Sequence, residues 1–248
     1  SAGAPAEEKT AARTSGRGRM MRERVQHESG IDPLPRPVWV ERDEGDGALV
    51  DCRFRRLVPR AAWDALPQDV RRRFSKRLTG QATATYSGEI VWTRLSGAGW
   101  LLAQLCRLIG APLPLAESGP APAAVAVSED RESGGQCWTR LYGRARGHPQ
   151  VIHSAKSFSG ATGLEEHIGG GFGMALTVRA EGDALLFTSD HYFWRRGRFR
   201  LRLPSWVTPG ETVVTHQHLG SGRFAFDLRV THPRLGELVN QHGLFRDG

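Results

Sequence analysis

The part of the chain from Ala123 onward reads as a succession of short strands separated by tight turns. Residues 198–203 alternate arginine with a large apolar residue, and successive side chains of a strand point to opposite faces. Glycine-containing turns stand at residues 133–135, 181–183 and 220–222. Connections this short join antiparallel neighbours, because a parallel pair needs a crossover of about a dozen residues or more. The sequence therefore predicts a long antiparallel sheet with arginines on its solvated face.

Two segments ahead of these strands have helical periodicity. Residues 61–74 carry a large apolar side chain at steps of three or four, and Pro67 either interrupts this helix or begins a second one. Residues 97–109 form a clearer helix that ends at Gly110. We therefore expect an α+β fold in which a curved antiparallel sheet of about 8–10 strands grips one or two helices, as a half-barrel or helix-grip arrangement.

The composition changes along the chain divide it into three parts. Residues 1–30 are rich in Ala, Gly, Ser, Arg and Glu without apolar periodicity, which predicts a disordered basic arm. Residues 31–56 contain three prolines and an acidic patch, which is typical of a linker. Residues 57–246 are then expected to form a single domain, long enough to bury a sizeable core.

The number and spacing of the cysteines, and the lack of long apolar runs, indicate the cellular compartment in which the protein is expected. The three cysteines are odd in number, far apart and outside metal-ligand or redox spacing. The sequence contains no apolar run of the roughly 18–20 residues needed to cross a bilayer, and its beginning lacks the apolar core of a signal peptide. We expect a cytoplasmic protein without a transmembrane segment.

The chain is basic, with a formal net charge of +8 supplied almost entirely by arginine. The arginines of residues 195–202, beside the aromatic residues 192–194, would suit a nucleic-acid backbone with stacked bases. The simpler interpretation is the solvated face of a sheet, where charges also discourage edge-to-edge association. We therefore do not expect a nucleic-acid partner.

Short motifs run in a fixed order through residues 57–245. They lie at residues 80–94, 110–112, 137–140, 163–166, 203–209, 222–227, 233–236 and 243–244. Together they resemble the bacterial domain-of-unknown-function family DUF4166, whose domains are often fused to saccharopine-dehydrogenase-like or epimerase-like proteins. The resemblance implies a fold and a partner of that kind, but no catalytic residue. His242 departs from the family, which usually has an aromatic residue before the final glycine.

Four residues are the best acid–base candidates, because they flank expected strand ends: Glu165, Glu166, His167 and His191. Adjacent residues of a strand point to opposite faces, so only one of the two glutamates can share a pocket with a histidine. The sequence has no nucleophile elbow and no justified Ser-His-Asp order. These features favour a non-catalytic protein.

Two further motifs suggest cofactors only at first sight. The glycine run at residues 169–173 is followed by a strand, whereas a phosphate loop opens a helix, so a sheet connection is expected. His216 and His218 share one strand face, but zinc needs three or four ligands. We expect neither a cofactor nor a metal.

Large aromatic residues on elements expected to face one another are the candidate ligand-binding residues: Trp100, Trp138, Phe172, Phe199, Phe224 and Phe226. The helix at residues 100–109 is apolar nearly all round, so it is packed core, a lid over a cavity, or an interfacial contact with anionic lipid.

The leading hypothesis is non-catalytic binding of an apolar or amphipathic small molecule between sheet and helix. The alternatives are an enzyme or accessory domain that works with a redox or epimerase partner, and a basic module for nucleic acid or a membrane surface.

Overall fold

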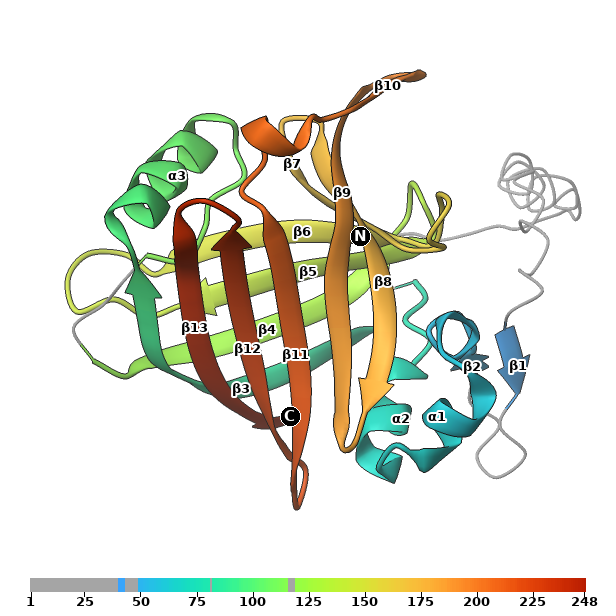
Figure 1. The fold of residues 1–248 in the computed structure, drawn as a ribbon. Coiled ribbons are helices and arrows are strands. Elements are labelled where there is room, and N and C mark those ends of the chain that lie inside the picture. Colours follow the sequence, from blue (N-terminus) through green and yellow to red (C-terminus); the bar gives the residue numbers. More distant parts are fainter. Residues whose placement is uncertain (1–39, 43–48, 81, 116–118) are drawn as a thin grey trace, which may run out of the picture. The chain divides into compact units, whose positions relative to one another are not determined.

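The computed structural model describes residues 40–42, 49–80, 82–115 and 119–248 (Figure 1). In this described part, ten antiparallel strands close into a barrel. The strands are β3 (Thr83–Leu95), β4 (Ala121–Asp130), β5 (Gly135–Tyr142), β6 (Gln150–Ser157), β7 (Glu165–Gly169), β8 (Phe172–Glu181), β9 (Ala184–Arg196), β11 (Glu211–Gly220), β12 (Arg223–His232) and β13 (Gly236–Asp247). Each strand pairs with the next along the chain, and β13 pairs back onto β3 to complete an up-and-down barrel.

The expected α+β half-barrel is wrong, because the structure is mostly β, with 54% strand against 16% helix. The pairing of β13 with β3 satisfies backbone groups that the two edge strands of an open sheet would leave exposed. Local patterns reveal pairing between consecutive strands, whereas this pairing joins the first and last strands of the barrel. Closure also leaves no open face on which the sheet could grip a helix.

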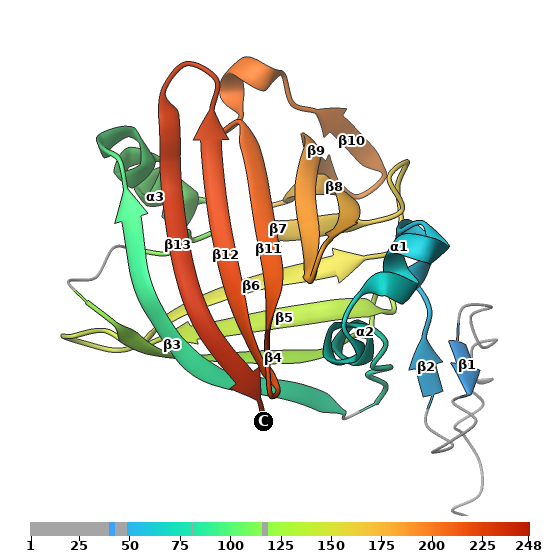
Figure 2. The same cartoon turned by 60° about the horizontal axis from the view of Figure 1, so that its bottom comes forward.

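The helices of the described residues lie at the two ends of the barrel rather than inside a curved sheet (Figure 2). At one end are the short helices η1 (Arg55–Leu57), α1 (Arg60–Ala65) and α2 (Gln68–Phe74), and Pro67 stands at the N-cap of α2. The second interpretation of Pro67, as the start of a new helix, is therefore confirmed. At the other end lies α3 (Gly97–Leu108), which begins at Ser96, whose hydroxyl accepts a hydrogen bond from the Gly99 amide at 3.1 Å.

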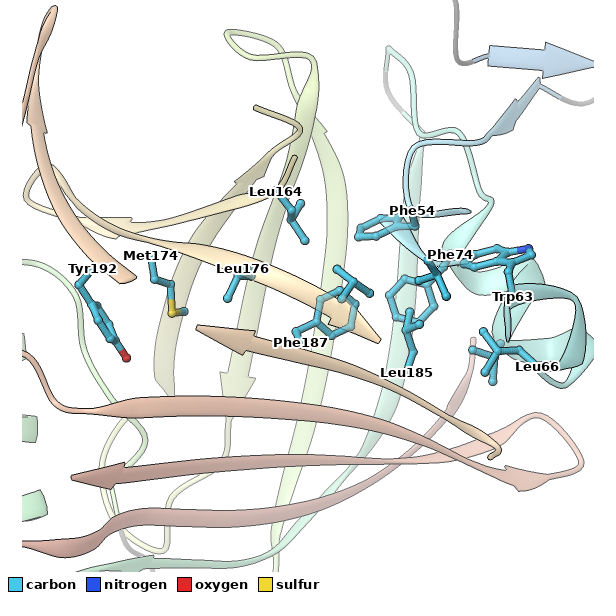
Figure 3. Packing of buried hydrophobic residues seen from close by; sticks show 13 residues of the cluster. Phe54, Trp63, Leu66, Phe74, Leu164, Met174, Leu176, Leu185, Phe187 and Tyr192 are labelled. Atoms are coloured by element: carbon cyan, nitrogen blue, oxygen red, sulfur yellow. The ribbon is translucent and has the colours of Figure 1, made fainter. Parts of the chain in front are cut away.

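The aromatic side chains at the α1–α2 end fill the barrel (Figure 3). The ring of Phe54 lies 5.2 Å from that of Phe74, and Phe74 lies 5.6 Å from Phe187 of β9, measured between ring centroids. Trp63 and Leu66 of the α1 region are buried in the same cluster. Aromatic contacts of this kind add to the stabilisation from burial, so this end is the main core of the molecule.

Part of the segment expected to be a linker contributes to this core. Phe54 is fully buried, as is Asp51, the last residue of β2 (Leu49–Asp51), which pairs antiparallel with β1 (Val40–Arg42). The Asp51 carboxylate accepts hydrogen bonds from Arg53 Nε and Nη2, at 2.9 Å and 2.6 Å. The expected arm at residues 1–30 lies outside the described residues.

The alternating arginine strand does not lie in the barrel wall. It forms β10 (Phe199–Arg202), which pairs only with β9 and extends beyond the barrel (Figure 1). Phe199 and Leu201, expected on a buried face, are 58% and 49% exposed. Arg200 is exposed, as expected, but its guanidinium also lies over the Phe193 ring, 3.9 Å from the ring centre. Alternation predicts a strand with two different faces, but it does not say which face has a packing partner.

Candidate functional site

The barrel interior is not completely filled at the α3 end, where it contains a cavity of about 120 Å³. Leu102 and Cys106 of α3 line it from outside the strands, and Tyr192, Leu228 and Val230 line it from the barrel wall. We call α3 the roof of this cavity. The lining is mostly apolar, which is typical of sites for small molecules.

Glycines allow the roof to sit close to the strands. A Cβ atom at Gly99 would overlap the backbone oxygen of Leu238 in β13. At the other end of the helix, Gly170 in the β7–β8 turn has a φ of 57° and lies against the backbone of Ile109. The glycine run that superficially resembles a phosphate loop is therefore a sheet connection that supports the end of α3.

Three charged side chains inside the barrel, which we call the interior charge cluster, are Arg140, Lys156 and Glu166. Arg140 and Glu166 line the cavity, and Lys156 lies beside them. Lys156 and Glu166 are cross-strand partners on β6 and β7, so they point to the same face. Lys156 Nζ lies 2.8 Å from Glu166 Oε2, and Arg140 Nη2 lies 3.5 Å from Glu166 Oε1. Arg140 Nη1 also donates to Ser154 Oγ at 3.1 Å. Two cations therefore face a single carboxylate.

The protonation of this cluster follows from its burial and its charges. Burial alone would raise the pKa of Glu166, but Lys156 and Arg140 outweigh it and lower that pKa to about 2. Burial lowers the pKa of Lys156, and Glu166 opposes this effect. Glu166 thus remains ionised, and it faces two basic side chains, Lys156 and Arg140. The cluster therefore holds one basic group more than it holds carboxylates.

Aromatic residues separate the cavity from the filled end of the barrel. Phe226 lines both the cavity and a smaller void of about 30 Å³ on the α2 side, which Trp138 and Phe224 also line. The Lys156 ammonium lies 4.9 Å from the centre of the Trp138 ring, within the range of a cation–π contact. The aromatic rings of Trp138, Phe224 and Phe226 therefore lie between the filled end and the interior charge cluster.

The six predicted ligand-binding residues fall into two groups. Trp138, Phe224 and Phe226 point into the barrel interior, whereas Trp100, Phe172 and Phe199 are absent from the lining of both the cavity and the void. Trp100 lies on the outer side of α3 and is 57% exposed. Because α3 is apolar nearly all round, its sequence alone does not reveal which side faces the barrel.

Sequence reasoning missed the interior charge cluster as a unit, although one signal for it existed. Lysine occurs only at positions 9, 76 and 156 in this arginine-rich chain. Lys156 shares strand parity with Ile152 and Ser154, two residues that line the cavity. A rare lysine on the inward face of a strand was therefore visible, but its partner Glu166 was not.

Three of the four acid–base candidates converge outside the barrel. Glu165 is buried in an ion pair with Arg200 of β10, and its Oε2 atom lies 3.8 Å from His167 Nε2. His191 Nε2 lies 3.4 Å from Arg200 Nη2, while its Nδ1 atom lies 2.6 Å from Asp190. Burial lowers the pKa of His167, and Arg195 adds to this effect. These contacts fasten β10 to the barrel wall, and Glu166 points to the opposite, interior face.

His216 of the His-Gln-His motif lies inside the filled end. Its ring stacks on Phe224 with a centroid distance of 4.4 Å and meets Phe74 edge-on at 5.1 Å. Burial and, to a smaller extent, the nearby charge of Arg73 lower the pKa of His216 to about 3. Within the described ranges, no three His, Cys, Asp or Glu side chains gather as a metal site.

The comparisons with known proteins identify the family. No curated protein matches the chain. Among the described residues, no helix has both the length and the apolar character needed to span a membrane. The family model described as "Domain of unknown function (DUF4166)" matches residues 66–245, well over half of the 248 residues. The chain therefore belongs to the DUF4166 family, as its motifs predicted.

Proposed function

We propose that the barrel binds a small amphipathic molecule with an acidic head group. The apolar part would occupy the cavity beneath α3, and the head group would pair with Arg140. The observation that carries this proposal is that the interior charge cluster, beside a mostly apolar cavity, holds two basic side chains and one carboxylate.

The physical chemistry of the cluster favours an anion over a neutral ligand. A buried charge is stabilised only when it is paired and hydrogen-bonded. Glu166 is already engaged by Lys156 at 2.8 Å, whereas its contact with Arg140 is longer, at 3.5 Å. A carboxylate beside Arg140 would accept two hydrogen bonds from its planar guanidinium. Apolar surface buried beneath α3 would add to the affinity.

The test compares octanoate with octanol, which has the same chain length but no charge. Binding to the full chain is measured by calorimetry and by native mass spectrometry. We expect octanoate to bind more tightly than octanol, and Arg140→Gln to weaken octanoate binding by about 10- to 100-fold, the loss typical of a charged hydrogen bond. Octanol binding should be unchanged in this variant.

The matched control is Arg179→Gln, because Arg179 lies on an exposed position of β8. It should bind both molecules as the unaltered protein does. A second variant, Leu228→Trp, fills the cavity and should abolish binding of both. The proposal fails if the unaltered protein binds neither molecule, or if Arg140→Gln binds octanoate with unchanged affinity.

A further inference from the structure

The exposed apolar residues are concentrated at the α3 end of the barrel. Thirteen large hydrophobic side chains are exposed among the described residues, and ten of them belong to elements at this end (Figures 1 and 2). These ten, which we call the apical patch, are Trp100, Leu101, Leu105, Leu108, Ile109, Phe199, Leu201, Trp206, Val207 and Leu235. They come from α3 and the residue after it, β10, the short helix η2 (Ser205–Val207) and the β12–β13 turn. Such a concentration is typical of an interaction surface.

The outward side of α3 is the largest part of the apical patch. Leu101, Leu105 and Leu108 lie on one side of the helix, and Leu108 is 83% exposed. Leu102 and Cys106 point the other way, into the cavity. The helix therefore needs apolar surroundings on two sides, and the barrel provides them on only one.

Exposed arginines surround the apical patch. They are Arg107 of α3, Arg195, Arg196, Arg198 and Arg202 of the β9–β10 hairpin, and Arg234 of the β12–β13 turn. The exposed acidic residues at this end are Asp190, Glu211 and Glu237. Glu237 is engaged by Arg229 at 3.7 Å and Asn240 at 2.8 Å. The surface is therefore positive as well as apolar.

We infer that the apical patch docks on the surface of an anionic lipid bilayer. Its leucines and tryptophans would enter the boundary between head groups and acyl chains, and its arginines would pair with lipid phosphates. The outward side of α3 carries no acidic residue and so lacks the opposite charges with which a protein partner would be selected. Tryptophan and arginine mixed at the tips of several short elements suit the head-group layer better than a flat protein surface.

Docking in this orientation would bring the roof of the cavity against the membrane. An amphipathic ligand held in the bilayer would then be next to the helix that covers its site. This link rests on the proposed function, whereas the docking itself does not.

The test is co-sedimentation of the full chain with phosphatidylcholine vesicles, with and without phosphatidylglycerol. We expect binding to the anionic vesicles and little binding to the neutral ones. Leu105→Ser with Leu108→Ser should weaken binding about tenfold or more, because both side chains lose their apolar burial. Arg196→Ser with Arg198→Ser should weaken binding to anionic vesicles by a similar factor, at about fivefold per arginine.

The control is Leu219→Ser. Leu219 is also an exposed leucine, but it lies at the end of β11 next to the β11–β12 turn, at the opposite end of the barrel (Figure 1). It should bind vesicles as the unaltered protein does. Unchanged melting temperatures would show that all variants remain folded. Equal binding of the leucine variant and the unaltered protein would overturn the inference. So would a dimer in gel filtration that this variant disperses, because the patch would then belong to a second copy.

The two proposals fail separately. Arg140→Gln should bind vesicles normally, and the Leu105/Leu108 variant should bind octanoate normally. Loss of vesicle binding in the leucine variant alone supports docking whatever the outcome with octanoate.

Discussion

The two ends of the barrel are closed by helices in different ways. At the α1–α2 end, Phe54 and Phe74 enter the space between the strands and leave a void of only about 30 Å³. At the α3 end, the helix lies outside the strands and contributes Leu102 and Cys106 to the lining of a cavity of about 120 Å³. The same barrel is therefore closely packed at one end and contains a cavity at the other.

The difference arises from the direction of the side chains rather than from the amount of apolar residue. Both helical regions are rich in large apolar side chains, but those at the filled end point inward and those of α3 point mainly outward. Burial stabilises in proportion to the apolar area removed from water. The filled end should therefore dominate the free energy of unfolding, and the following substitutions test this comparison.

Truncation of an aromatic side chain at the filled end should have the largest effect on the free energy of unfolding. Phe54→Ala should lower the free energy of unfolding by about 4 kcal/mol, since it leaves a cavity among close-packed rings. Leu102→Ala, at the half-buried roof, should cost about 1 kcal/mol or less because the space beside it is already open. Urea denaturation measures both. Equal losses would contradict the assignment of stability to the filled end.

The interior charge cluster lies between the two ends. Removal of its one carboxylate should have the second-largest effect on the free energy of unfolding. Glu166→Gln leaves Lys156 and Arg140 without a carboxylate, so we expect a loss of about 3 kcal/mol. Glu181→Gln is the control, since Glu181 is exposed at the end of β8. Thermal unfolding at constant pH measures the difference. A neutral effect of Glu166→Gln would mean that the two cations are not desolvated in solution.

A substitution in α3 should separate the roof from the barrel. Gly99→Ala forces the helix away from Leu238 and should cost about 2 kcal/mol through local strain. Gly97→Ala in the same helix meets no atom within 4 Å and should be neutral or slightly stabilising. Amide hydrogen exchange of α3 would show faster exchange for the first variant alone. Similar exchange in both variants would show that close approach at Gly99 is unimportant.

The filled end should also be sensitive to acid, through His216. Its pKa is about 3 in the fold against an ordinary 6.5, so the unfolded chain binds a proton that the folded protein excludes. Stability should therefore fall as the pH drops below 6.5, by about 1 kcal/mol over the first pH unit. Glu166 adds its own loss only below its ordinary pKa of 4.5.

The measurement is the free energy of unfolding between pH 7 and pH 5. His216→Phe should reduce the pH dependence in this interval and leave the part that comes from His167, whose pKa burial also lowers. His153→Gln, on the exposed surface, should preserve the full dependence. A slope that His216→Phe leaves unchanged would assign the acid sensitivity to other groups.

Several features of the fold and of the site were readable from local sequence. The succession of antiparallel strands, the start of a helix after Pro67 and the opposite directions of Glu165 and Glu166 all follow from short-range geometry. Phe224 and Phe226 lie two apart on one strand, so the sequence places them on the same face, and both line the barrel interior. The family motifs were also recognisable from their order.

The sequence by itself determined the strands, their meander and the family. Only the tertiary structure decided that the sheet closes, that α3 turns its larger apolar side to solvent and that Arg140 joins Lys156 and Glu166. The physical reason is that strand alternation is a property of neighbouring residues. Closure depends instead on partners far apart in the chain, such as Val239 and Leu95. Only when the barrel has closed does a side chain have an interior position. Closure therefore also decides that the basic side chains Arg140 and Lys156 lie beside the cavity with a single carboxylate.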